Sequence, residues 1–178
     1  QGKIRYLGLS NETPYGLSQY LKLSESKNLP RVVSVQNPYS LVNRTYEVGL
    51  AEMSIREQAG LLAYSPLAFG MLSGKYLNGQ MPEGSRLKLF GSHFPRYQGT
   101  RTQLAVEEYY KVAQKHNLSL AQMSLAFVNA QPFVTSNIIG ATAMEQLKEN
   151  IESINLDLSD EIMEEINAIH ENNPSPAP

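Results

Sequence analysis

Four short apolar runs separated by helix-like segments constrain the fold more than any other feature of this sequence. The runs are Ile4–Ser10, Val32–Gln36, Gly60–Ser65 and Val134–Gly140. Their nearly continuous apolar character is typical of parallel strands that are covered on both faces. A helical pattern follows each run, and this alternation favours right-handed βαβ units. The sequence therefore predicts an α/β fold with a parallel sheet.

Helix start signals support this alternation. Thr13 can cap a helix that has Pro14 in its first turn, where the missing N–H of proline costs nothing. Leu17 and Leu21 lie four residues apart and therefore share one face of that helix. A second helix is expected over Tyr46–Gln58.

Further helices are expected nearer the C-terminus, two of them between the third and fourth runs. The expected caps and buried positions are Ser119 with Gln122 for Leu120–Ala130, Thr142 with Glu145 for Ala143–Glu152, and Ser159 for a last helix that buries Ile162, Ile166 and Ile169. The connection Leu67–Thr102 is long enough to indicate a functional or mobile loop. The polar, proline-rich segment Asn172–Pro178 is expected to be irregular.

Two architectures fit four βα units. One is half of a (β/α)8 TIM barrel, which needs eight strands and typically about 250 residues. The other is a doubly wound sheet, but Ser10-Asn11 follows the first run where that fold has a glycine-rich fingerprint. We expect a C-terminal half-barrel, with extra helices, that forms a single unit over residues 1–178. The chain begins Gln1-Gly2-Lys3 without methionine, so we expect the N-terminal half-barrel to be absent from it.

The composition argues against several functional classes. The 178 residues carry a net charge of −2, which offers no basic surface for nucleic acid or an anionic membrane. No run approaches the ~20 apolar residues of a bilayer span. The chain has no cysteine and hence no thiolate metal site, which fits a reducing, cytoplasmic location. His93, His116 and His170 are far apart in sequence, so we expect packing or surface roles and no metal site.

Polar side chains gather where the predicted strands end, which is where the function of a barrel lies. These ends read Ser10-Asn11, Gln36-Asn37, Tyr64-Ser65-Pro66-Leu67 and Gly140-Ala141-Thr142. Amides and hydroxyls suit a polar, uncharged group such as a carboxamide, and Tyr64 offers a face for a flat ring. Helix capping and core packing explain the same residues, so both interpretations stay open.

The stretch that follows the third run combines glycines with a lysine. Gly70 and Gly74 let the backbone approach a ligand, and Lys75 supplies a charge for phosphate. This is not a Walker P-loop, because the glycines are one residue too close and Tyr76 replaces the magnesium-binding Ser or Thr. Arg86 could clamp a second phosphate oxygen. A solvated loop with scattered cations fits the spacing equally well.

The helix expected over Ala143–Glu152 follows a strand directly, so its free N–H groups and dipole favour a phosphate. Gln146, Glu149 and Asn150 share one face and could hydrogen-bond a base and its ribose. On periodicity alone, an ordinary exposed helix face explains them as well.

These pieces occur together and in order. The strings GKIRYLGLSN, VQNPYS, AYSPLAFGMLSGKY and IIGATAMEQLKENI resemble the C-terminal half of the aldo-keto reductase superfamily, over nearly the whole chain. The resemblance implies a nicotinamide cofactor, NADP(H) or NAD(H), and a small aldehyde or ketone as substrate. It offers Phe69, Phe90, Phe94 and Tyr97 as candidates for the substrate pocket.

The resemblance also implies cofactor roles for particular positions. Ser10, Asn11 and Gln36 match residues that hydrogen-bond the nicotinamide carboxamide, and Tyr64 matches the aromatic residue that stacks on the ring. The positions that match the pyrophosphate loop are Ser65, Leu67, Gly70, Lys75 and Arg86. The positions that match the adenosine end are Thr142, Gln146, Glu149 and Asn150.

Two departures limit what the resemblance implies. Gly140 and Gln146 stand where many members place basic residues against the 2′-phosphate of NADP, so the preference for NADP over NAD is open. The family's catalytic residues belong to its N-terminal half, and none of the ten tyrosines here matches the motif of the catalytic tyrosine. We therefore expect an NAD(P)H-dependent carbonyl reductase whose cofactor site lies mostly in this chain, and no catalysis by this chain alone.

Two alternatives remain. The chain could be a non-catalytic cofactor-binding or regulatory module, as in family members that serve as potassium-channel β subunits. It could also be an inert half-barrel that self-associates through its exposed strand edges, because unpaired edges and apolar faces favour association.

Overall fold

The sheet has four strands, all parallel, in the order β1-β2-β3-β4. The computed structural model describes residues 2–178. The strands are β1 (Leu7–Ser10), β2 (Val32–Pro38), β3 (Gly60–Tyr64) and β4 (Val134–Asn137). Strands that follow one another in sequence are neighbours in the sheet, as in a barrel, whereas a doubly wound sheet reverses its strand order at a switch point. The doubly wound alternative is therefore excluded.

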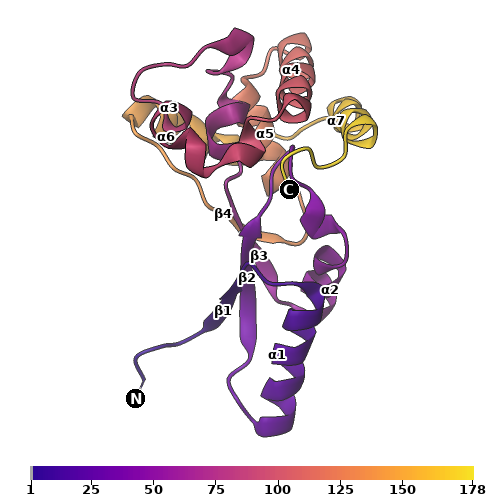
Figure 1. Ribbon diagram of the computed structural model, residues 1–178. Coiled ribbons are helices and arrows are strands. Elements are labelled where there is room, and N and C mark those ends of the chain that lie inside the picture. The colour runs from indigo at the N-terminus through magenta and orange to yellow at the C-terminus, as the bar shows by residue number, and fades with distance from the viewer. Residues whose placement is uncertain (1) are drawn as a thin grey trace.

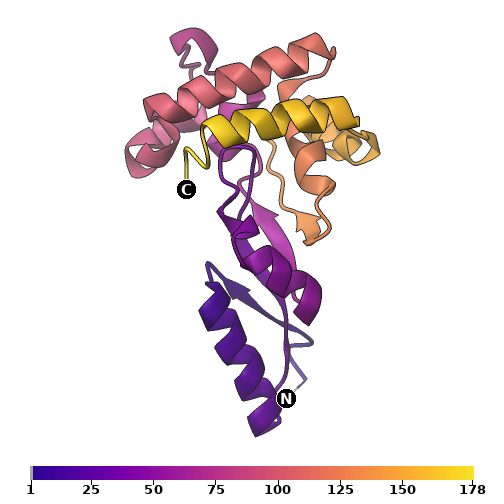
Figure 2. The same ribbon diagram turned by 90° about the vertical axis from the view of Figure 1, so that its right-hand side faces the viewer.

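Helices connect successive strands. The helices α1 (Pro14–Lys27) and α2 (Leu50–Glu57) lie on the same side of the sheet (Figure 1). Between β3 and β4 come α3 (Arg86–Phe90), α4 (Thr100–Lys115) and α5 (Leu120–Asn129), and after β4 come α6 (Met144–Glu152) and α7 (Asp160–Asn172). Figure 2 shows α4 and α7 lying alongside each other. Within residues 2–178, no helix is both long and apolar enough to cross a membrane.

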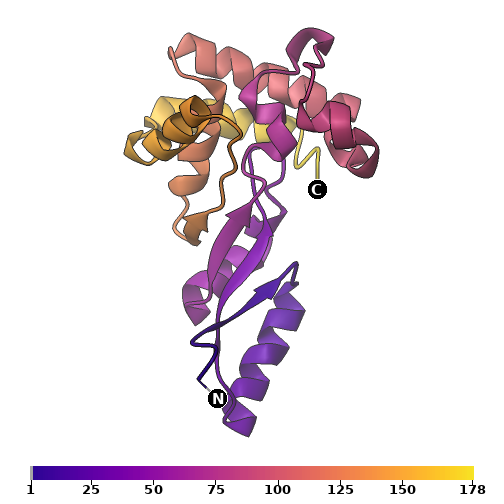
Figure 3. The same cartoon turned by 90° about the vertical axis from the view of Figure 1, so that its left-hand side faces the viewer.

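The molecule is elongated. The helices α3 to α7 gather at one end, β1 and α1 form the other end, and the sheet joins the two (Figure 3). The core lies between the sheet and its helices, where Val35 and Leu61, partners in the β2–β3 register, are both fully buried. β1 and β4 are the edge strands of this four-stranded sheet.

The start of α1 confirms its predicted signals. The Thr13 hydroxyl oxygen accepts a hydrogen bond of 3.1 Å from the amide of Gly16, and Pro14 occupies the first position of the helix. Leu17 and Leu21 are buried against the sheet as expected. Asn28 ends the helix in a left-handed conformation, which asparagine tolerates better than most residues.

The strands at both edges are shorter than predicted. The run Ile4–Ser10 forms a strand only from Leu7, and the side chains of Ile4 and Tyr6 are 71% and 76% exposed. The run Val134–Gly140 is a strand only as far as Asn137. Apolar character predicted buried strands, but an edge strand of an open sheet has no neighbour to extend its ladder.

The helix predicted over Tyr46–Gln58 is broken. A 3₁₀ turn covers Thr45–Glu47, and α2 begins only at Leu50. Gly49 lies between them with φ of +96°, a conformation that interrupts a helix and that glycine adopts readily.

Two capping predictions have different outcomes. Ser119 caps α5, since its hydroxyl oxygen accepts a hydrogen bond from the amide of Gln122. The capping box of Thr142 with Glu145 is wrong, because Ala143 is the N-cap of α6 and its side chain accepts no hydrogen bond.

Two further expectations, for the last helix and for the loop before α4, are confirmed only in part. Ser159 caps α7, and Ile162 and Ile166 are buried, whereas Ile169 is only partly buried. The predicted loop Leu67–Thr102 contains a series of short helical turns, which are Ala68–Ser73, Leu77–Gly79, α3, Gly91–His93 and Pro95–Tyr97.

Candidate functional site

Ser10 and Gln36 lie side by side at the carboxyl ends of β1 and β2. They are partners in the parallel register, and Gln36 is in turn the partner of Leu62 on β3. Because side chains alternate between the faces of a strand, Tyr64 points to the same face as Leu62. The opposite face holds the buried core. The predicted carboxamide group of residues therefore shares one face of the sheet.

Asn11 connects β1 to β3 across this face. The hydroxyl of Tyr64 donates a hydrogen bond of 2.8 Å to the side-chain oxygen of Asn11, and the Asn11 amide donates one of 3.0 Å to the main-chain oxygen of Gln36. Asn11 has a φ of +53°, which directs the chain out of the strand at this point. Burial raises the pKa of Tyr64, and the nearby Arg96 partly offsets that rise. The structure thus brings together four residues predicted to hold the nicotinamide.

Asn37 shows a different role for a strand-end amide. Its side-chain oxygen accepts a hydrogen bond of 3.0 Å from the amide of Glu12, and its side-chain nitrogen donates one of 2.9 Å to the carbonyl of Glu12. This pair fixes the turn that leads from β1 into α1.

The segment after β3 is a tight loop with unusual backbone angles. Ser65, Phe69 and Gly70 have φ values of +54°, +61° and +98°. A Cβ atom at Gly70 would lie 3.0 Å from Cε of Lys75 and 3.3 Å from its Nζ, so the ammonium group packs against the bare glycine backbone. The amide of Gly70 donates to the carbonyl of Leu67 at 2.8 Å. The loop therefore holds the ammonium group of Lys75 against the loop's own main chain at Gly70.

Arg86 begins α3 and lies over the ring of Phe69, with 5.0 Å between the guanidinium carbon and the ring centroid. Phe69 packs against Phe94 with the rings tilted by 35° and the centroids 4.3 Å apart, and it stacks on Tyr97 at 5.8 Å between centroids. Three of the four aromatic residues proposed for a substrate pocket are therefore in one cluster, while Phe90 is exposed and is not part of the stack.

Some cationic side chains on this loop have no acidic partner, whereas Lys88 pairs with Glu83. Among residues 2–178, Lys75 and Arg86 form no ion pair with an Asp or Glu carboxylate, and Arg96 bonds the main-chain oxygen of Pro178. Unpaired cations beside a glycine-lined backbone fit the phosphates of a dinucleotide.

The residues assigned to the adenosine end are Thr142, just before α6, and three residues of α6, and all four make contacts within the chain. Gln146 accepts hydrogen bonds from the amide and the hydroxyl of Thr142 at 3.0 and 3.2 Å. Glu149 accepts one from the hydroxyl of Ser119, and Asn150 is only 5% exposed and donates to the carbonyl of Gly140 at 3.3 Å. Thr142 and Gln146 face solvent, so they are the members of this group best placed to meet a ligand.

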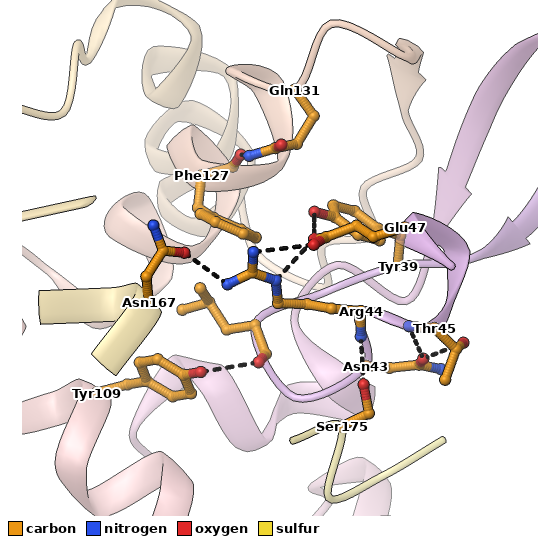
Figure 4. A network of polar contacts seen from close by, with 11 residues as sticks. Tyr39, Asn43, Arg44, Thr45, Glu47, Tyr109, Phe127, Gln131, Asn167 and Ser175 are labelled. Carbon is orange, nitrogen blue, oxygen red and sulfur yellow. Dashed lines mark hydrogen bonds and ion pairs between the residues drawn. The ribbon is translucent and has the colours of Figure 1, made fainter. Parts of the chain in front are cut away.

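A network around Arg44 that the sequence did not reveal holds the loop after β2, residues 39–47 (Figure 4). The guanidinium donates to the side-chain oxygen of Asn167 at 2.8 Å and lies 5.0 Å from the centroid of Phe127. It also pairs with Glu47, which accepts a hydrogen bond from the hydroxyl of Tyr39. The loop at the carboxyl end of β2 is thereby tied to α5 and α7.

The irregular segment 173–178 packs closely along this end of the molecule. The amide of Ala177 donates to the carbonyl of Val42 at 3.0 Å, and the Ala177 side chain is fully buried. Thr102 donates to the carbonyl of Pro176 at 3.0 Å. The predicted lack of regular structure is confirmed for residues 173–178, whereas Asn172 is the last residue of α7. Specific contacts nevertheless hold the segment 173–178.

The sequence spacing of the histidines did not predict one cluster of a histidine with two carboxylates. His116 lies at the end of α4, and its ring nitrogen is 3.1 Å from Glu165 on α7, with Glu161 one turn away. The ammonium of Lys115 bonds both carboxylates, at 2.9 and 2.7 Å, so this protein cation already occupies the place of a metal ion. The pKa of Glu165 is lowered by Lys115 first and by His116 second.

A cavity of about 190 Å³ lies between the loop and α4, lined among others by Met71, Tyr76, Leu87 and Val106. The described residues that line it include none of the predicted cofactor positions.

Comparison with known proteins identifies the family of this chain. A sequence model described as "Aldo/keto reductase family" matches residues 1–171. The chain belongs to the aldo/keto reductase family. The "Protein tas" of Escherichia coli strain K12 is 56% identical over 177 residues, which cover 99% of this chain and 51% of that protein.

Two other relatives are more distant. The "Aldo-keto reductase" of Babesia bovis is 40% identical over 96% of this chain and 62% of its own length. The "L-glyceraldehyde 3-phosphate reductase" of Escherichia coli strain K12 is 33% identical over 86% of this chain and 45% of its own length. The chain therefore spans about half the length of the curated relatives it matches. The four-stranded parallel sheet with its helices is consistent with part of the (β/α)8 barrel of the aldo/keto reductase family.

Proposed function

We propose that this chain, as a single unit, supplies most of the cofactor site of an NAD(P)H-dependent reductase of aldehydes and ketones. The observation that carries the proposal is the gathering of Ser10, Asn11, Gln36 and Tyr64 on one face at the strand ends. This donor set fits a carboxamide attached to a flat ring. A bound nicotinamide would supply a hydride to the carbonyl carbon of the substrate.

The residues of this chain would bind and orient that group. Tyr64 would support the ring face, and the loop from Ser65 to Lys75, with Gly70 and Leu67 within it, would surround the pyrophosphate together with Arg86. Thr142 and Gln146 would meet the adenosine end, with Glu149 and Asn150 behind them. NADP(H) is the proposed cofactor, and NAD(H) would use the same contacts except at the 2′-phosphate.

A fluorescence titration of the chain with NADPH tests the cofactor site. We expect saturable binding that is lost in Tyr64→Ala with Lys75→Ala. The matched control is Tyr20→Ala with Lys22→Ala, since both side chains are exposed on α1 and far from the strand ends. No binding by the unaltered chain, or equal loss in both pairs, would favour an inert half-barrel.

Turnover separates a reductase from a cofactor-binding module. We propose that this chain holds no catalytic residue, so the purified 178-residue chain is expected to reduce little or no carbonyl substrate. Turnover by that chain, with its mass verified as 19.8 kDa, would contradict this. The intact mass of the natural protein tests whether further chain completes the barrel, because a completed barrel requires a mass well above 19.8 kDa.

We also propose that this chain self-associates through its exposed barrel edges. Leu7 and Val33, on β1 and β2, are 38% and 39% exposed, and Met144, Leu147 and Ile151 form an exposed apolar stripe on α6. Leu7 lies on the edge strand β1, whereas Val33 and the α6 residues lie on exposed faces, and apolar edges and faces both favour association. Sedimentation should show a concentration-dependent increase in mass, and a monomer at all concentrations would exclude the proposal.

A further inference from the structure

Asn78 and Gly79 form the only Asn-Gly pair in the sequence, and they lie at the centre of a tight turn in the long loop before α3. Asn78 has a φ of +56° and Gly79 a φ of +72°. The amide of Gln80 donates a hydrogen bond of 3.2 Å to the carbonyl of Leu77 across the turn. Positive φ values at both central residues are typical of a type I′ turn, for which Asn-Gly is a preferred sequence.

The turn leaves the side chain of Asn78 open to attack by the neighbouring main chain. Asn78 and Gly79 are both exposed, and a Cβ atom built at Gly79 would have no neighbouring atom within 4 Å. Turns at the surface open locally at a small fraction of the free energy of global unfolding. During such openings, the main-chain nitrogen of Gly79 can reach the side-chain carbonyl carbon of Asn78.

The reaction that follows requires these two residues and water. The nitrogen of Gly79 loses its proton to water and attacks Cγ of Asn78, so that an N–Cγ bond forms, the Cγ–Nδ2 bond breaks and ammonia leaves. Water then adds to either carbonyl carbon of the resulting succinimide ring and breaks a C–N bond, which gives aspartate or isoaspartate. Glycine favours ring closure because it has no Cβ atom to crowd the attacking nitrogen.

We propose that Asn78 is a site of spontaneous deamidation, and that its conversion to isoaspartate loosens the wall of the cavity beside α4. Asn78, Gly79 and Glu107 all line this cavity. Isoaspartate carries the main chain through its side chain and adds an atom to the backbone, so the hydrogen bond across the turn is lost. Both products also place a second carboxylate beside the cavity that Glu107 lines, and like charges repel. The proposal is independent of the cofactor site.

Ageing the natural protein that contains this chain in mildly alkaline buffer tests the modification. Peptide mass spectrometry measures the conversion of each asparagine, and labelling by protein isoaspartate methyltransferase detects isoaspartate. Asn28 and Asn117 are matched controls, because both are exposed, have φ values of +50° and +55°, and precede leucine instead of glycine. We expect Asn78 to convert at least about 10-fold faster than either control, since its barrier to ring closure is lower.

A gain of reactivity at one control site tests the role of glycine. Leu29→Gly places a glycine after Asn28, at a position where the leucine side chain is 54% exposed. Asn28 should then convert about 10-fold faster than in the unaltered protein, while Asn117 keeps its rate. Equal rates at Asn78, Asn28 and Asn117 in the folded, unaltered protein would overturn the proposal.

Hydrogen exchange at the Gln80 amide tests the effect on the cavity wall. Aged protein that contains isoaspartate should exchange this amide about 10-fold faster than fresh protein, because the hydrogen bond to Leu77 is lost. Asn78→Asp separates charge from backbone, since it adds the carboxylate but keeps an ordinary main chain, and it should exchange nearly as slowly as fresh protein. Unchanged exchange in the aged protein, or equally fast exchange in Asn78→Asp, would contradict the effect assigned to isoaspartate.

Discussion

Arg44 donates hydrogen bonds from Nε and Nη2 to the two carboxylate oxygens of Glu47, at 2.6 and 2.9 Å. A bidentate pair of this kind is stronger than a single ion pair and fixes the planes of both groups. Only 11% of the Arg44 side chain is exposed, so solvent screens the pair weakly. The pair therefore stabilises the 39–47 loop at the carboxyl end of β2.

Replacing Arg44 by Gln should destabilise the chain. Glu47 and Asn167 would lose their cationic partner inside the protein, and an unpaired buried charge costs about 3 kcal/mol or more. Urea unfolding measures this loss. Arg56→Gln breaks an exposed pair with Glu52 and should change the unfolding free energy by less than about 0.5 kcal/mol. Similar losses in both variants would show that the Arg44 network carries no special stability.

Gly70→Ala should disturb the loop after β3. The φ of +98° is strained for alanine, and the new methyl group would press on Lys75. We expect a loss of about 1–3 kcal/mol in unfolding free energy, together with weaker NADPH binding. Gly99→Ala is the control, because Gly99 has an ordinary φ of −66° and the nearest atom to its Cβ lies 4.0 Å away. NADPH affinity that is unchanged in Gly70→Ala would argue against a role of this loop in the cofactor site.

Stability should fall in mildly acidic solution because of His170. Its Nδ1 atom is buried without a hydrogen-bond partner, and burial first and Arg44 second lower the pKa of this histidine. As the pH falls below the ordinary histidine pKa of about 6.5, the histidine binds a proton in the unfolded chain but not in the folded chain. The unfolding free energy therefore decreases. The decrease ends once the pH is below the lowered pKa of the folded state.

His170→Gln should reduce the difference in stability between pH 7 and pH 5, as measured by urea unfolding at each pH. His93→Gln is the control, because His93 is exposed on the loop and should leave that difference unaltered. Glu165 affects stability in a more acidic pH range than His170. Because its pKa is lowered in the folded chain, it stabilises that chain above about pH 4.5, and this stabilisation is lost as the pH falls further. A His170→Gln variant with unchanged pH dependence would contradict the assignment.

Ala177→Glu should release the C-terminal segment. The methyl group of Ala177 is fully buried, and a carboxylate cannot be accommodated there without a partner. We expect the free energy of unfolding to decrease by about 1–3 kcal/mol, a loss that cannot exceed the cost of detaching residues 173–178. Hydrogen exchange at the Ala177 amide should also become faster. Ala141→Glu, at an exposed position, should have neither effect.

Local patterns predicted the parts of the fold that depend on neighbours in the sequence. Thr13 and Pro14 gave the start of α1, and polar residues at Ser10, Gln36 and Tyr64 gave the strand ends that the sheet brings together. Parallel strands place their carboxyl ends at one edge, so this part of the site follows from strand order alone.

The remaining features depend on contacts between distant segments. Arg44 meets Asn167 across 123 residues, and His116 meets Glu165 across 49, and neither separation has a periodic signal. The prediction that Ile4 and Tyr6 belong to a buried strand is wrong because hydrophobicity does not reveal whether a neighbouring strand exists. The contacts of Phe69 with Arg86 and Tyr97 also depend on the fold of the long loop, which no repeat or motif specifies.

The hydrogen bond between the Arg44 amide and the Ser175 hydroxyl joins residues that are 131 positions apart. The 39–47 loop emerges from the ribosome well before Ser175 has been synthesised, so the loop cannot form its contact with Ser175 until translation is nearly complete. Until then the strands can pair, but the carboxyl end of β2 lacks the segment that completes its packing. Truncation or a translational pause shortly before residue 173 should therefore leave a chain whose sheet has formed. In that chain, the 39–47 loop beside the proposed cofactor site would still lack its contacts with the C-terminal segment.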